Sequence, residues 1–216
     1  KKIGKLDYTS EIYVRPNQYL GLRNNFISNV KLNKFLIDMD ASLVNSGMDT
    51  LKSRFLTTNA RVGYELNKVI TGIKLQAEDN QKEVRDTSLD ASTYRFQDIS
   101  AFIETRGEET VSARLSTGIR VDEKTAQNNL KPFTKASYVQ SEGEIKFSPS
   151  HSWGIMFNYK NVEVYNKELW TDVNSENVLS GRISNRIAIL KRLLTMSNFY
   201  EIGSGLESKK EYAFLK

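Results

Sequence analysis

The chain has 216 residues, with 31 basic and 26 acidic side chains and a net charge of +5. It contains no Cys and a single His, which excludes disulfides, thiolate chemistry and the common multi-histidine metal sites. No run of 18 apolar residues occurs, so a transmembrane helix is excluded. Acidic and basic residues are interleaved, and no recognition helix or aromatic RNA-binding motif is evident. We therefore expect no nucleic-acid partner.

The chain begins Lys1-Lys2-Ile3 without an initiator Met and ends at Lys216 in the middle of a pattern. We interpret residues 1–216 as a single β-meander segment of a longer protein.

The first predicted hairpin turns at Asn33-Lys34. Asn tolerates the left-handed conformation that a type I′ turn demands. Alternate residues after the turn are apolar and the others are polar, including Asp38 and Asp40. Arg23 and Lys31 fall on the same face of the preceding strand, so we expect them to neutralise the two aspartates.

A nearly identical turn, Asn67-Lys68, follows 34 residues later. Folding the chain there places Val62 opposite Ile73 on an apolar face and Gly63 opposite Gly72 on a polar face. A slip of one residue would mix the two faces, so the pattern selects this register.

The same register places Arg61 opposite Lys74, and two like charges in that position repel each other. We expect a neighbouring acid to compensate, with Glu65 and Glu78 as the candidates.

Later segments continue the alternation. Residues 111–121 alternate without error, short turns are predicted near 106–109 and 148–151, and a third hairpin turns at Lys191-Arg192. Longer polar connections are expected at 45–52, 78–92, 122–132, 166–175 and 203–209. The predicted fold is all-β: an antiparallel up-and-down meander of about twelve long strands with alternating short turns and long loops, forming a barrel or part of a larger barrel.

Strands with one apolar and one polar face suit two architectures. In a transmembrane barrel the apolar face meets lipid, whereas in a soluble sandwich or curled sheet it packs into a core. The length of the strands and the short-then-long connections favour the barrel. Aromatic residues near strand ends are consistent with interfacial girdles: Tyr94, Phe133, Trp153, Tyr165, Phe199 and Tyr200.

Two segments carry a resemblance to a known class of protein. Residues 57–68 (TTNARVGYELNK), followed by Glu78-Asp79-Asn80, and residues 197–212 (SNFYEIGSGLESKKEY) resemble internal segments of large, β-rich, uncharacterised outer-envelope proteins of Gram-negative bacteria. The resemblance implies an outer-membrane location and a barrel-like fold. It implies no activity and no catalytic residue.

Charged residues at polar-face positions are the candidate functional residues, as lining of a lumen: Arg61, Glu65, Lys74, Arg114, Arg120, Arg182 and Arg186. They could handle anions such as lipopolysaccharide, polysaccharide or polypeptide. Alternatively, they form a ladder of charges balanced by glutamates such as Glu104, Glu142 and Glu144, and we favour this ladder.

No catalytic, cofactor-binding or metal-binding residues are predicted. His151 lies in a Ser-rich turn without a nucleophile elbow nearby and is expected to be an exposed turn histidine. We therefore expect a non-enzymatic outer-membrane barrel for transport, export or envelope scaffolding, with membrane lipid and an envelope protein or polysaccharide as candidate partners. The alternative is a soluble periplasmic or cell-surface β domain that binds glycan or a protein.

Overall fold

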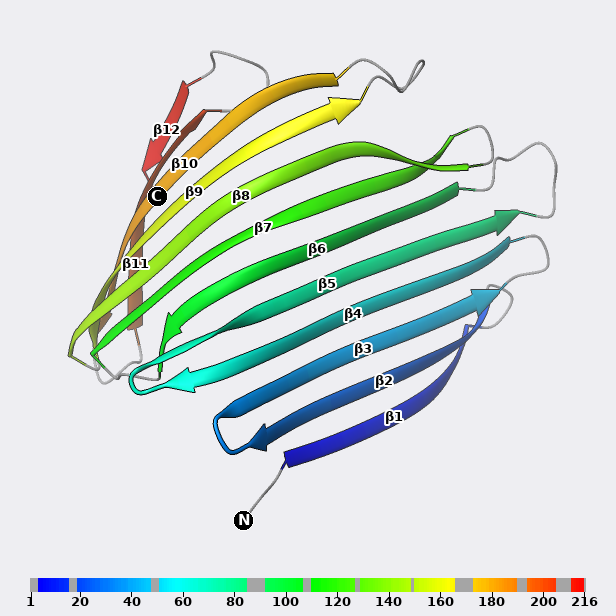
Figure 1. Cartoon of the computed structure of the whole chain (residues 1–216), viewed down its shortest axis with the longest axis horizontal. Coiled ribbons are helices and arrows are strands. Elements are labelled where there is room, and N and C mark those ends of the chain that lie inside the picture. Colours follow the sequence, from blue (N-terminus) through cyan, green and yellow to red (C-terminus); the bar gives the residue numbers. More distant parts are fainter. Residues whose placement is uncertain are drawn as a thin grey trace.

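The computed structural model contains twelve strands in one antiparallel sheet, each paired with its neighbours in chain order (Figure 1). The strands are β1 (Gly4–Arg15), β2 (Tyr19–Leu32), β3 (Phe35–Gly47), β4 (Leu51–Leu66), β5 (Val69–Val84), β6 (Ser92–Thr105), β7 (Val111–Ala126), β8 (Asn129–Ser148), β9 (His151–Tyr165), β10 (Val173–Ile189), β11 (Leu194–Ser204) and β12 (Glu211–Leu215). The structure describes residues 4–15, 19–47, 51–84, 92–106, 110–126, 129–148, 150–165, 173–189, 194–204 and 211–215. Within these ranges no helix has the length and apolar character needed to cross a membrane.

The predicted meander and its register are confirmed. In β4 and β5, Val62 pairs with Ile73 and Gly63 with Gly72. The third hairpin also has the predicted register, since Ile189 pairs with Leu194, although its turn lies outside the described residues.

The two Asn-Lys turns differ from the predicted type. Asn33 and Asn67 have positive φ angles of 56° and 48°, whereas Lys34 and Lys68 do not. A type I′ turn requires positive φ at both central residues, so the left-handed Asn was predicted correctly and the turn type was not.

The prediction of long polar loops is partly wrong. Strands β7 and β8 run through most of 122–132 and leave only residues 127–128 between them, while β3 and β4 leave only 48–50. At the end of the sheet opposite turns 33–34 and 67–68, the connections are therefore not uniformly long. The polar residues that suggested loops continue the hydrogen-bonded ladder, with a β-bulge in which Phe133 is the extra residue of β8 opposite Asp122 and Glu123.

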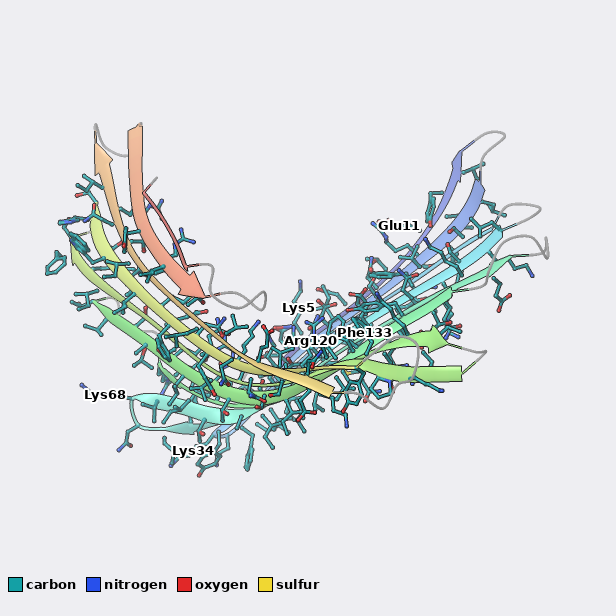
Figure 2. The ribbon with its side chains drawn as sticks, turned by 90° about the horizontal axis from the view of Figure 1, so that it is seen from above. Lys5, Glu11, Lys34, Lys68, Arg120 and Phe133 are labelled. Carbon is teal, nitrogen blue, oxygen red and sulfur yellow. The ribbon has the colours of Figure 1, made fainter. Side chains whose placement is uncertain are left out.

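The sheet is strongly curved, and its two faces differ in chemistry. Figure 2 shows it as an open arc with Glu11 and Arg120 on the inner, concave side. Among the residues whose burial is described, the buried side chains share the face of Arg120: Ser100, Phe102, Ser116, Asp122 and Ser152. Apart from Ile27 and Leu51, the exposed large apolar residues lie on the convex face, so curvature crowds the polar face and spreads the apolar one.

The convex face is apolar over only part of each strand. This apolar belt adjoins the end of the sheet that holds turns 33–34 and 67–68, which we call the turn rim; the opposite end is the loop rim. The belt covers alternate residues of Phe35–Leu43, Leu56–Leu66, Val69–Ala77, Ile99–Thr105, Val111–Val121, Val139–Phe147, Trp153–Tyr159 and Leu179–Ile187, with Thr, Ser, Gly and Asn185 interspersed. At about 3.3 Å per residue and a tilt of about 40°, nine residues give a height of roughly 20–25 Å.

Both edges of the belt step in the same direction across the sheet. Ladder partners on successive strands form rows across the sheet. The row that begins at Phe35, the first residue of β3, crosses β7 at Leu115 and β9 at Phe157, well inside those strands. At the other edge, the row through Leu43 and Leu56 continues into Asp79 and Arg95. The belt thus runs obliquely to these rows. A flat layer that crosses the tilted strands of a barrel would also run obliquely to them.

The predicted aromatic girdle is partly wrong. Trp153 and Tyr200 lie on the convex face, but Tyr94 lies on the concave face, where its hydroxyl donates to Asp122. Phe133 also lies there, 6.2 Å from the Tyr94 ring, because the bulge turns it inward (Figure 2). The side chain of Phe199 is outside the described residues.

Candidate functional site

All seven sequence-predicted site residues lie on the concave face: Arg61, Glu65, Lys74, Arg114, Arg120, Arg182 and Arg186. The structure does not bring them into one cluster. They divide among a central aromatic cluster, an ion-pair site near the turn rim, a network toward the loop rim and a polar trough.

The central cluster is built around Phe102, which is only 3% exposed. It lies over Gly63 and Gly72, since a Cβ on Gly63 would be 3.7 Å from its ring and Gly72 pairs with it in the ladder. The guanidinium of Arg61 stacks 4.4 Å from the ring centre and that of Arg114 5.8 Å away. Phe102 is the only buried apolar side chain that the structure describes on the concave face. Its ring packs on two glycines and is covered by two arginine side chains.

Glu104 completes this cluster. Arg61 donates a hydrogen bond to its carboxylate, and Arg114 Nε lies 3.9 Å from the other oxygen. The compensating acid for Arg61 is therefore Glu104 of β6, and not Glu65 or Glu78 as the sequence suggested. Glu104 was expected among the glutamates that balance the charge ladder, but not as the partner of Arg61, although it alternates in phase with the polar face.

The packing around Gly72 and Gly181 predicts that alanine has unequal effects on stability at these two positions. A Cβ on Gly72 would lie 2.0 Å from the Val62 carbonyl oxygen, whereas at Gly181 the nearest atoms are 4.0 Å away. Because backbone must shift to admit the first methyl group, we expect Gly72→Ala to destabilise the sheet by about 1–3 kcal/mol and Gly181→Ala to be nearly neutral. Denaturant titration of both variants measures this, and equal effects would contradict the packing described.

Glu65 sits in a separate ion-pair site near the turn rim. Lys31 donates to it at 2.6 Å and Arg106 approaches to 3.6 Å, while its side chain is 12% exposed. The predicted pairing of Lys31 with Asp38 and Asp40 is therefore wrong, because the lysine reaches across β3 to Glu65. The pairing of Glu65 with Lys31 and that of Arg61 with Glu104 both fit the balanced charge ladder.

Lys74 has like charges as neighbours. It pairs in the ladder with Arg61 and interacts electrostatically with Arg114, while Asp98 supplies the attraction. Asp98 also accepts a 2.7 Å hydrogen bond from Tyr138, whose hydroxyl lies over Gly118.

Arg120 belongs to a network toward the loop rim. Its guanidinium donates to Asp122 at 2.8 Å and stacks 4.1 Å from the centre of the Phe96 ring. Tyr94 and Thr134 also donate to Asp122, each at 2.8 Å. Thr134 joins this network because it is the ladder partner of Asp122, the last pair before the β-bulge.

Arg114, Arg182 and Arg186 line a trough of about 590 Å³ on the concave face of β6–β10. Its floor is made of small residues, including Ser152 and Gly154. Three glutamates share its walls, Glu104, Glu142 and Glu144, and Lys146 lies 3.8 Å from Glu144. The trough is thus a water-accessible, mixed-charge surface.

Charge is distributed unequally along the concave face. On β7–β10 there are eight basic residues (Arg114, Arg120, Lys124, Lys131, Lys146, Lys160, Arg182, Arg186) and four acidic ones (Asp122, Glu142, Glu144, Glu176). The concave positions of β1–β3 hold four basic residues (Lys5, Arg15, Arg23, Lys31) and four acidic ones (Asp7, Glu11, Asp38, Asp40). The two arms of the arc face each other in Figure 2, so the hollow of the arc has one basic wall and one wall with balanced charge.

His151 is not the exposed turn residue expected. It is the first residue of β9, is half-buried, and lies on the convex face with Nε2 3.1 Å from Asn185 Nδ2 and its ring 5.4 Å from that of Phe147. Among the described residues, no three His, Asp or Glu side chains are grouped so that they could hold a metal ion.

Comparison with protein-family models and with curated proteins gives no match. Among solved structures, the chain is similar to the translocator domain of the autotransporter NalP from Neisseria meningitidis, with a TM-score of 0.42, 8% identity, and 93% of this chain and 80% of that chain covered. It is also similar to outer-membrane expressed OmpT of Vibrio cholerae (TM-score 0.42, 8% identity, 95% and 88% covered). A third similar structure is the beta domain of the Bordetella autotransporter Brka (TM-score 0.33, 11% identity, 97% and 92% covered).

Proposed function

We propose that the chain is a membrane-embedded β-barrel segment of the bacterial outer membrane, with its apolar belt in the lipid and its concave face lining a water-filled interior. It would act in transport, export or envelope scaffolding without covalent chemistry. The observation that carries this proposal is the apolar belt, whose height and oblique course match a bilayer crossed by tilted strands.

The single-layered packing supports the membrane over a soluble sandwich. Among the described residues, the extensive contacts between strands join only neighbours in the sheet, and central belt residues such as Ile73, Ile119 and Ile183 are 53%, 55% and 49% exposed. A sandwich would cover this face with a second sheet. An exposed apolar surface of this extent is a membrane or protein interaction surface.

The concave face supports a hydrated interior. Its side chains are held by ion pairs and hydrogen bonds, such as Arg61 with Glu104 and Arg120 with Asp122, which keeps the wall fixed and polar. The excess of basic residues on β7–β10 favours anionic solutes or an anionic polysaccharide as the material handled.

Fluorescence from one tryptophan tests this proposal. The chain has two Trp residues, so Trp170→Phe leaves only Trp153, a belt residue on the convex face that is 45% exposed. In phosphatidylcholine vesicles with brominated acyl chains, we expect its emission to be strongly quenched compared with unbrominated vesicles. A folded, monodisperse protein that stays in solution and whose emission is not quenched by the brominated vesicles would refute the proposal.

A matched control moves the tryptophan to the other face. Lys160 is an exposed concave residue of β9. In the Trp170→Phe background, Trp153→Phe with Lys160→Trp should give emission that bromine does not quench, because this side chain faces the interior.

A further inference from the structure

A second hollow, of about 610 Å³, lies at the loop-rim end of β1–β5. Two hydrogen-bonded rows of convex residues cross it. One joins Ile12, Leu22, Asn45, Arg54 and Gln81, and the other passes through Leu20, Gly47 and Lys52. The hollow therefore lies on the side that the proposed function assigns to lipid.

The two ends of this hollow differ in chemistry. At the β1–β2 end, Ile12, Leu20 and Leu22 are 75%, 60% and 36% exposed. At the β4–β5 end, Lys52 and Arg54 are exposed, and neither makes an ion pair or hydrogen bond with a described residue, although Glu83 is the ladder partner of Lys52. Asn45 and Gly47 line the hollow between these two ends.

The hollow adjoins the loop-rim edge of the apolar belt, one convex row beyond Leu43 and Leu56. Because that edge runs obliquely, the row of Ile12 and Leu22 is still apolar on β1 and β2, whereas the same row carries Arg54 and Gln81 on β4 and β5. Adjacent strands are about 4.8 Å apart, so the apolar and cationic ends are roughly 10 Å apart. A membrane lipid has its acyl chains and its headgroup at a comparable separation across the same boundary.

We propose that this hollow binds an anionic lipid with a phosphate-bearing headgroup. Its acyl chains would pack on Ile12, Leu20 and Leu22, and its phosphate would be bound by Lys52 and Arg54. Arginine matches phosphate with a bidentate fork and lysine adds a compact charge. The inference rests on the proposed function, because it needs the belt to lie in a bilayer.

Native mass spectrometry of the full chain in detergent micelles tests the site, with phosphatidic acid and phosphatidylcholine of identical acyl chains as probes. We expect retention of phosphatidic acid to exceed that of phosphatidylcholine by about tenfold. The double variant Lys52→Gln/Arg54→Gln should lose this preference. The matched control Lys34→Gln/Lys68→Gln removes two charges at the turn rim, where Figure 2 places both lysines, and should keep it.

Three outcomes would overturn the inference: an unchanged preference in Lys52→Gln/Arg54→Gln, an equal loss in the turn-rim control, or displacement of the lipid by excess inorganic phosphate. The last would indicate a phosphate site that needs no acyl chain. Flotation with phosphatidylcholine vesicles separates this failure from that of the proposed function. A chain that floats without lipid preference refutes only the site, whereas a chain that does not float refutes the membrane location.

Discussion

Replacing Ile183 with Arg is expected to destabilise the chain by about 2–4 kcal/mol in a phosphatidylcholine bilayer, the cost of an arginine at the lipid midplane of a β-barrel. Ile183 lies at the centre of the belt segment Leu179–Ile187 and is 49% exposed on the convex face. Its side chain contacts lipid in the proposed arrangement, so a guanidinium there has no water within reach. Unfolding of the vesicle-inserted protein with guanidinium chloride measures the loss in the free energy of unfolding.

The matched control is Ser175→Arg on the same strand and face. Ser175 lies beyond the loop-rim edge of the belt, is exposed, and pairs with Glu163, so an arginine there reaches water and an opposite charge. We expect a change within about 0.5 kcal/mol. Equal losses at the two positions would contradict the belt boundary, and no loss at Ile183 would place the convex face in water.

Alternation along the chain was sufficient to predict strand order, register and faces. In β4 and β5, shifting the register by one residue would put Arg61 beside Ile73, so a single arrangement was consistent with the sequence. The left-handed Asn67 supported the same register, because few other residues adopt positive φ at low cost.

The partners of charged residues could not be predicted in the same way. Alternation places a residue on a face, but long side chains reach past the adjacent strand. Lys31 of β2 therefore pairs with Glu65 of β4, and Arg61 of β4 with Glu104 of β6. Which residues form ion pairs depends on the curvature of the sheet, because curvature brings side chains on the concave face together. The alternation of apolar and polar residues does not encode this curvature.

Two other errors lie around the β-bulge at Asp122. One extra residue in β8 opposite Asp122 and Glu123 shifts the phase of the strand, so Phe133 faces the interior although its neighbours suggested a loop. Polar composition was taken as evidence of a loop between 122 and 132. The strands in fact extend beyond the apolar belt, where both faces are polar and the ladder continues.

Phe102→Ala is expected to have the largest effect on the concave side, a loss of about 3–5 kcal/mol. The substitution removes the one described apolar side chain that is buried and leaves a gap over Gly63 and Gly72. It also removes the surface on which Arg61 and Arg114 stack, so both guanidinium groups lose their cation–π contact.

Two further variants separate burial from stacking. Phe102→Leu keeps apolar volume without an aromatic face, so its loss should be intermediate. Phe35→Ala removes a ring that is 51% exposed on the convex face, and its loss should be clearly smaller. Denaturant titration in vesicles should therefore rank the losses, from greatest to least, as Phe102→Ala, Phe102→Leu and Phe35→Ala. If Phe35→Ala cost more than Phe102→Ala, the tightly packed face would be the convex one, and the assignment of interior and lipid-facing sides would be reversed.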